Sequence, residues 1–267
     1  ALQMLAYALF RQDRNREAEE TAKAALEADN SPNAASLLAR IRKAMSDEHG
    51  MTEQHLSHFN VRYDGEAHED VGREILRALE RHYATLSASL DGQPRSTIAV
   101  ILFSSEAYYT ASGAPAWSGG AFDITDGRIR IPIGGLTPGL TPEMDRTLIH
   151  ELTHAFVYDR SRGIAPREIQ EGLAQYMEGK RLGSELSEAQ LGALADGRVQ
   201  GVFGFYLQAL SLVEYLIASR GLGGMNDLIR AMGETGDLDA AFRQVYGQSW
   251  HAMRQAWAQR FRQQHGS

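Results

Sequence analysis

Apolar and polar residues alternate around Phe59, Val61 and Tyr63, and this alternation predicts a half-buried strand. The spacing then becomes helical, with a stripe formed by Val71, Ile75, Leu79, His82, Leu86 and Leu90. Residues 97–103 form a short continuous apolar run, which predicts a central strand. The order strand, helix, strand therefore predicts a sheet with a covering helix.

A hairpin is predicted next, from residues 121–125 and 128–133 on either side of Asp126 and Gly127. This dipeptide favours a two-residue turn with both residues at positive φ. Pro132 predicts an edge strand, because proline donates no hydrogen bond to a sheet. Such an edge could bind an extended peptide by adding it to the sheet. The alternative is that the hairpin only covers the core.

Helical spacing dominates the rest of the chain. Helices are predicted from Thr141 to Gly163, from Pro166 to Gly179, and over residues 185–196, 203–219, 224–233, 237–246 and 249–264. The predicted fold class of the main domain is therefore α+β. We expect a small sheet and the 141–163 helix in its N-terminal half, helices in its C-terminal half, and the functional cleft between the halves.

Residues 1–45 have alanine-rich helical spacing that resembles one tetratricopeptide repeat, with Asp13 where the turn glycine usually stands. Such arrays need about three repeats. The resemblance therefore implies that the segment docks on the main domain or belongs to a longer array, and that it contacts a protein partner. A plain helical hairpin is the alternative. The polar residues 46–56 predict a linker, and residues 57–267 are the predicted main domain.

Length, composition and net charge limit the kinds of partner that we expect this chain to bind. With 267 residues and 43% hydrophobic content the chain can bury a sizeable core, and its net charge of -7 argues against nucleic acid or an anionic membrane as principal partner. The absence of cysteine excludes disulfides and thiolate metal sites. We expect no transmembrane segment, because Gln208 and Glu214 interrupt the best apolar run. Ala1 begins inside a helical pattern, which predicts a processed or excised chain.

His150, Glu151 and His154 have His-Glu-x-x-His spacing in the middle of the 141–163 helix. Residues four apart lie on one helical face, so both imidazoles can bind one ion. Glu171, on the next predicted helix, is the candidate third ligand. Two histidines and a glutamate are typical of catalytic zinc, which keeps a fourth position for water. The alternative is a pair of buried histidines without a metal.

His150-Glu151-x-x-His154, followed after sixteen residues by Glu171-Gly172-Leu173-Ala174-Gln175-Tyr176, resembles the gluzincin metallopeptidases of the peptidase MA-like group. The similarity covers about residues 56–263 and includes the stretch 117–123. It implies a zincin-like catalytic domain, a zinc-bound water, a glutamate base and peptide substrates. Members are often exported, which favours a periplasmic or secreted location. The chain departs from the family at two positions. The family often has tryptophan where Glu168 stands, and many members have an acidic residue where Gln175 stands.

Three further residues receive predicted roles. Glu151, offset by about 100° from His150 around the helix, is the predicted general base. Tyr206 is the predicted donor to the oxyanion, with an ordinary core residue as the alternative. Gln175 is predicted either to orient a zinc-bound histidine or to be structural.

The predicted function is a zinc-dependent peptidase. The alternative is a catalytically inactive zinc-binding scaffold whose N-terminal segment recruits a protein partner, and the intact Glu151 argues against it.

Overall fold

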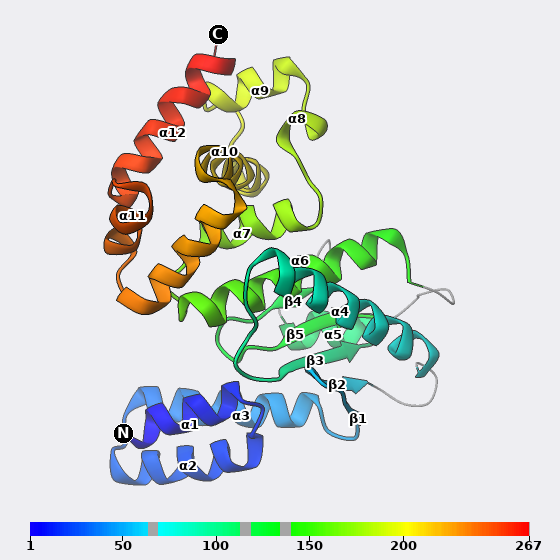
Figure 1. Cartoon of the computed structure of the whole chain (residues 1–267). Coiled ribbons are helices and arrows are strands. Elements are labelled where there is room, and N and C mark those ends of the chain that lie inside the picture. The colour runs from blue at the N-terminus through cyan, green and yellow to red at the C-terminus, as the bar shows by residue number, and fades with distance from the viewer. Residues whose placement is uncertain (64–68, 113–118, 134–139, 267) are drawn as a thin grey trace. The chain divides into compact units, whose positions relative to one another are not determined.

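A computed structural model of the chain describes residues 1–63, 69–112, 119–133 and 140–266. It divides into two compact units, of which unit 1 contains residues 1–80 and 96–145, and unit 2 contains residues 81–95 and 146–267. Helices and a small mixed sheet are both present, so the α+β class is confirmed (Figure 1). Trp117 and Ser118, which belong to the family resemblance, lie outside the described residues.

Three helices open unit 1 and lie side by side in Figure 1: α1 (Leu2–Arg11), α2 (Asn15–Ala28) and α3 (Pro32–Asp47). They share a core of small and branched side chains: Ala6, Leu9, Phe10, Ala18, Ala22, Leu37, Leu38, Ile41 and Ala44. Between α1 and α2, Asp13 adopts φ 62°, the left-handed conformation that a turn glycine would supply. The predicted helices are confirmed, and their likeness to a tetratricopeptide repeat stays a prediction.

The sheet of unit 1 has the strand order β1-β2-β3-β5-β4. Its strands are β1 (Thr52–His55), β2 (Phe59–Tyr63), β3 (Ile98–Phe103), β4 (Ala121–Phe122) and β5 (Ile129–Pro132). β3 is parallel to both β2 and β5, and the two edge strands are antiparallel to their neighbours. All six residues of β3 are buried, which confirms the predicted central strand. Residues 46–56, expected as a linker, contain the end of α3 and strand β1.

Alternation along the strands gives the sheet two different faces. One face carries Tyr63 and Leu102, and the first part of α4 (Glu69–Ser89) covers it through Gly72, where an added Cβ would lie 3.9 Å from each of them. The opposite face carries Ile101 in register with Arg62 and Arg130. There α5 (Ser105–Ser112) packs Tyr108 against Ile101 and Phe103.

The hairpin prediction is correct in its pairing and wrong in its turn. Ala121 pairs with Arg130, but the connection is longer than two residues, and of Asp126 and Gly127 only Gly127 has positive φ. Side chains replace the tight turn, because Asp123 Oδ1 accepts from Thr125 N at 2.8 Å and Asp126 Oδ1 accepts from Arg128 N at 3.0 Å. The predicted edge strand is also wrong, because β5 lies between β3 and β4, although β4 pairs only with Ile129 and Arg130 and does not reach Pro132.

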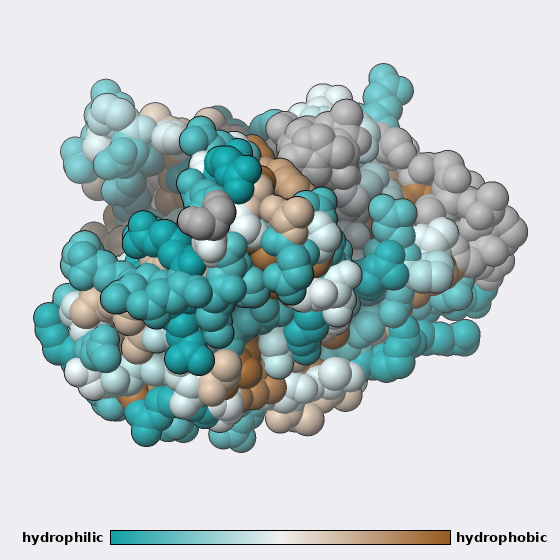
Figure 2. Space-filling view, turned by 90° about the horizontal axis from the view of Figure 1, so that it is seen from above, coloured by the Kyte–Doolittle hydropathy of each residue, from teal (hydrophilic) through white to brown (hydrophobic). Residues whose placement is uncertain are grey.

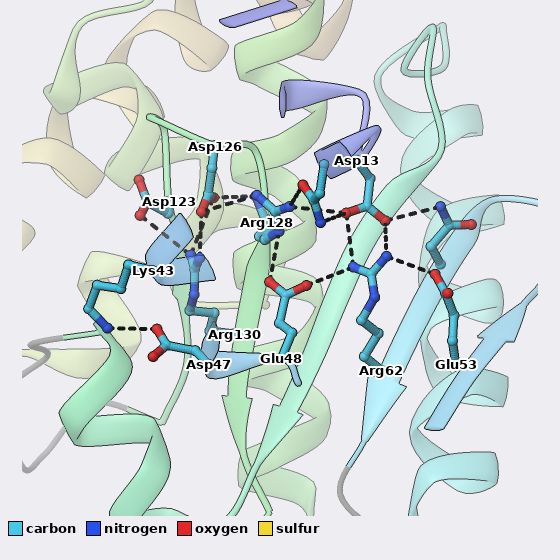
Figure 3. A network of polar contacts seen from close by, with 12 residues as sticks. Asp13, Lys43, Asp47, Glu48, Glu53, Arg62, Asp123, Asp126, Arg128 and Arg130 are labelled. Atoms are coloured by element: carbon cyan, nitrogen blue, oxygen red, sulfur yellow. Dashed lines mark hydrogen bonds and ion pairs between the residues drawn. The ribbon is translucent and has the colours of Figure 1, made fainter. Parts of the chain in front are cut away.

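A network of buried charges joins the N-terminal helices to the sheet (Figure 3). Asp13 accepts from Arg62 Nη2 at 2.7 Å and from Arg128 Nη2 at 3.1 Å. Glu48, just after α3, lies 3.0 Å from Arg62 Nη1 and 3.1 Å from Arg128 Nε. Burial disfavours the charged form of Arg62, but Asp13, Glu48 and Glu53 outweigh it and raise its pKa. The helices are therefore attached to the sheet by ionic contacts that are almost entirely shielded from solvent.

Unit 2 is helical. Its elements are the last part of α4, from Arg81, and the C-terminal part of α6 (Pro142–Ser161), then α7 (Arg167–Met177), α8 (Leu182–Glu185), α9 (Glu188–Ala195), α10 (Gly201–Thr235), α11 (Leu238–Tyr246) and α12 (Trp250–His265). Gly221, at φ 70° and ψ 178°, interrupts α10 as predicted. Two of its helices have side-chain N-caps, because Asp237 accepts from Ala240 N at 2.8 Å and Ser249 accepts from Ala252 N at 3.2 Å.

Among the described residues, α10 is the one helix long and apolar enough to cross a membrane, and 44% of its apolar window is buried inside the protein. Core helices of soluble proteins pass the same test, so the expected absence of a transmembrane segment stays a prediction. Figure 2 shows mainly hydrophilic residues on the face in view, with apolar residues in small areas between them.

Candidate metal centre

Helix α6 holds both histidines and Glu151 rigidly. Thr141 Oγ1 accepts from Met144 N at 3.2 Å and so caps the N-terminus of the helix. Leu148, Leu152 and Phe156 are fully buried along the helix. Because apolar packing fixes the rotation of the helix, it also fixes the direction of His150 and His154.

Glu171 comes from α7, and its position depends on a close approach to α10. A Cβ added at Gly172 would lie 2.2 Å from the carbonyl oxygen of Ala209, so a side chain there would push the helices apart. Gln175 Nε2 also joins the two helices, donating to Tyr206 O at 2.9 Å and to Glu171 O at 3.1 Å. Glycine and glutamine together therefore set the place of Glu171 relative to α10.

The three predicted ligands converge. His150 Nε2 and His154 Nε2 are 3.2 Å apart, and each lies 3.6 Å from Glu171 Oε2. Donor atoms about 2.0–2.2 Å from one tetrahedral ion are separated by about 3.3–3.6 Å. The donor set of two imidazole nitrogens and one carboxylate oxygen therefore fits a zinc ion in both chemistry and spacing. Within the described ranges, this is the one cluster of three such residues.

Both histidines also have an acceptor on their other ring nitrogen. His150 Nδ1 lies 3.3 Å from Glu178 Oε1, and His154 Nδ1 lies 3.3 Å from Gln170 Oε1. Lys180 Nζ approaches the same oxygen of Glu178 at 2.9 Å. A proton on each Nδ1 leaves both Nε2 lone pairs directed at the cluster, which is the arrangement that metal-binding histidines require.

The pKa values of two groups in the cluster are strongly shifted. Burial disfavours the charged form of His150, but its contacts with Glu171 and Glu178 and the charge of Glu151 outweigh burial and raise its pKa to about 10. Burial also favours neutral Glu171, yet the two histidines lower its pKa far below the usual range. Without a metal, His150 is therefore protonated at neutral pH beside the ionised carboxylate of Glu171.

Two further predicted residues lie near the cluster. The Tyr206 hydroxyl has a raised pKa because it is half-buried and because the charges of Glu171 and Glu151 act on it, while Arg167 opposes the shift. Glu151 is buried on α6, and its charge acts on both His150 and Tyr206. Glu151 and Tyr206 therefore lie within electrostatic range of the three donors.

The sequence missed the acceptors of the histidines. Glu178, to which no role was assigned, and Gln170 are these acceptors. The Gln175 amide nitrogen instead donates to backbone carbonyls, so the structural role predicted as its alternative applies. A signal existed for Glu178, because it follows Glu171 by seven residues, or about two helical turns. Two turns return a side chain to the same face, so Glu178 points toward α6 like Glu171.

A scan against protein-family models finds no match for this chain, and neither does a search of curated proteins. The resemblance to gluzincins therefore stays a prediction that rests on the motif and its spacing.

Proposed function

We propose that this protein is a zinc-dependent peptidase of the gluzincin type with a zincin-like catalytic domain. The observation that carries the proposal is the convergence of His150 Nε2, His154 Nε2 and Glu171 Oε2 at separations of 3.2 and 3.6 Å. A buried glutamate on the same helix as both histidines adds the base that hydrolysis needs. A purely structural site would leave Glu151 without a chemical role.

When bound, zinc would supply Lewis acidity and lower the pKa of a water toward about 7. Glu151 accepts a proton from the attacking water and passes it to the departing amine nitrogen. Tyr206 donates a hydrogen bond to the carbonyl oxygen as negative charge develops there. Glu178 and Gln170 keep each histidine in the tautomer with its proton on Nδ1.

The decisive experiment compares wild type with Glu151→Gln. Both proteins should contain about one zinc per chain, because Glu151 is not one of the converging donors. Wild type should cleave members of a broad peptide library, and the variant should lose about 10²–10⁴-fold in rate because the base is gone. Glu185→Gln, an exposed glutamate on α8, is the matched control and should leave the rate unchanged.

The outcomes separate the two functions inferred from the sequence. Equal cleavage by wild type and Glu151→Gln would remove the proposed mechanism. Bound zinc without cleavage of any library member would favour the inactive scaffold. Absence of zinc from wild type, and from wild type dialysed against zinc, would reject both functions.

A further inference from the structure

Arg167 lies one helical turn before Glu171 and faces its outer oxygen. Its Nε is 3.8 Å from Glu171 Oε1, whereas Glu171 Oε2 faces the histidines. The Arg167 side chain is 67% exposed, so a molecule approaching the cluster from solvent can reach it. The guanidinium therefore lies between the candidate metal centre and solvent.

Contacts with α10 hold this exposed side chain in place. Its Cζ lies 4.8 Å from the centre of the Phe205 ring, within the range of a cation–π contact. The Arg167 charge also acts on the Tyr206 hydroxyl, whose pKa it lowers. An exposed arginine normally samples many rotamers. The contact with Phe205 restricts that freedom, so less entropy is lost when Arg167 binds a ligand.

The charge balance around Arg167 favours an anionic ligand. Glu171 partly balances the guanidinium in the metal-free protein, at the long separation of 3.8 Å. Binding of a divalent cation to Glu171 would leave a local excess of positive charge beside Arg167. The forked donors of a guanidinium match the two oxygens of a carboxylate. Val202 and Phe203, both well exposed on the first turn of α10, provide apolar surface before Phe205.

We infer that Arg167 determines specificity by binding a carboxylate of the peptide substrate beside the scissile bond. This inference rests on the proposed peptidase function. The carboxylate is either the C-terminus of the peptide or the side chain of an aspartate or glutamate, since both present the same planar anion. The protein then favours acidic peptide ends or acidic side chains although its own net charge is -7.

The test measures binding separately from cleavage. Zinc-loaded Glu151→Gln protein is titrated with fluorescent peptide pools that differ only in one group: a free or amidated C-terminus in one pair, and glutamate or glutamine in the other. A charged hydrogen bond favours the acid form by about tenfold or more. We expect that ratio in at least one pair, and the pair that shows it identifies the source of the carboxylate. In Glu151→Gln with Arg167→Gln the ratio should fall to about one.

Arg254 offers a matched control. It pairs with Glu168 at 3.6 Å and lies 5.4 Å from the Trp250 ring, and it is half exposed, but none of these partners belongs to the cluster. Arg254→Gln should keep the acid-to-amide ratio. Zinc content is measured in every variant, because a lost ligand would weaken both members of a pair equally.

The inference is overturned by equal binding of acid and neutral peptides, by a preference that survives Arg167→Gln, or by no binding of any acidic pool. An acid preference that depends on Arg167, in a protein whose wild type cleaves nothing, would support the carboxylate site and reject the peptidase function. The experiment can therefore reject the carboxylate site and the peptidase function independently of each other.

Discussion

Nδ1 of His150 lies 3.3 Å from Oε1 of Glu178, the residue that caps the C-terminus of α7. Glu178 is itself buried and paired with Lys180, so its carboxylate is held in place on the side away from the metal donors. The contact connects the first histidine of the motif to the helix that carries Glu171. It also predicts that Glu178 affects metal affinity without being a ligand.

Glu178→Gln should weaken zinc binding about 10–100-fold, because it replaces a charged acceptor with a neutral one. Competition with a chromophoric chelator at pH 7.4 measures the affinity. Glu185→Gln makes the same chemical change on α8 and should leave the affinity unchanged. Equal zinc affinity in wild type and Glu178→Gln would show that this contact does not orient His150.

Zinc binding should release about one proton at pH 7. The pKa of His150 is about 10 in the metal-free protein, against 6.5 for an ordinary histidine, and only the neutral ring binds a metal. Apparent affinity should therefore rise about tenfold per pH unit from 7 until the pH approaches 10. Calorimetry in buffers with different ionisation enthalpies counts the protons, and a heat independent of the buffer would contradict the prediction.

The same shift has a consequence for stability. A raised pKa in the folded state means that His150 stabilises the metal-free protein fully below about pH 6.5, and that this contribution is lost as the pH rises through about 10. Chelated protein should therefore unfold at lower urea concentration at pH 9.5 than at pH 7. His150→Asn should reduce this difference between the two pH values.

Tyr206→Phe should lower kcat about 10²–10³-fold, with zinc content and KM little changed, because a neutral oxyanion donor acts only in the transition state. Tyr215→Phe, on the same helix, is the control. If the activity of Tyr206→Phe falls only in proportion to its thermal stability, Tyr206 is a packing residue.

Gly172→Ala should destabilise the protein by about 1–3 kcal/mol, because the new methyl group meets the backbone of Ala209 at 2.2 Å. Zinc affinity should fall with it, since α7 carries Glu171. In Gly223→Ala the new methyl group has open space, and the substitution should be neutral or slightly stabilising. Urea unfolding of both variants makes the comparison, and equal midpoints would reject the close helix contact.

Asp13→Asn should cost about 3 kcal/mol of unfolding free energy. The substitution keeps the shape of Asp13 and tolerates its positive φ, but it removes an anion that faces two buried arginines, Arg62 and Arg128. Asp47→Asn breaks the more exposed pair with Lys43 and should cost less than about 1 kcal/mol. If both variants have the same stability, the ionic network does not hold the N-terminal helices.

The common direction of His150 and His154 could be predicted from sequence, because the spacing of residues along a helix determines which face they share. His150 and His154 are separated by about one helical turn and so lie on one face of α6. The strand over Phe59 to Tyr63 was predictable for the same reason, since alternation there reports burial directly.

The ionic network could not be predicted, because its partners are far apart in sequence. Asp13 is 49 residues from Arg62 and 115 from Arg128. A buried arginine is identified only when its carboxylate is found, and no local pattern brings these residues together. The prediction of a two-residue turn at Asp126 was wrong for a related reason. The Asp126 carboxylate binds Arg128 N and Arg130, and these contacts replace the expected tight turn.

Three groups that contact the two histidines, Gln170, Glu171 and Glu178, belong to α7 and its cap. Local opening of this one helix would thus remove the carboxylate ligand and both orienting acceptors together. A bound ion selects the closed arrangement by mass action and raises the free energy of opening. Amide hydrogens of α7 should then exchange with solvent more slowly when zinc is present, so that metal binding fastens α7 onto α6 in the manner of a cross-link.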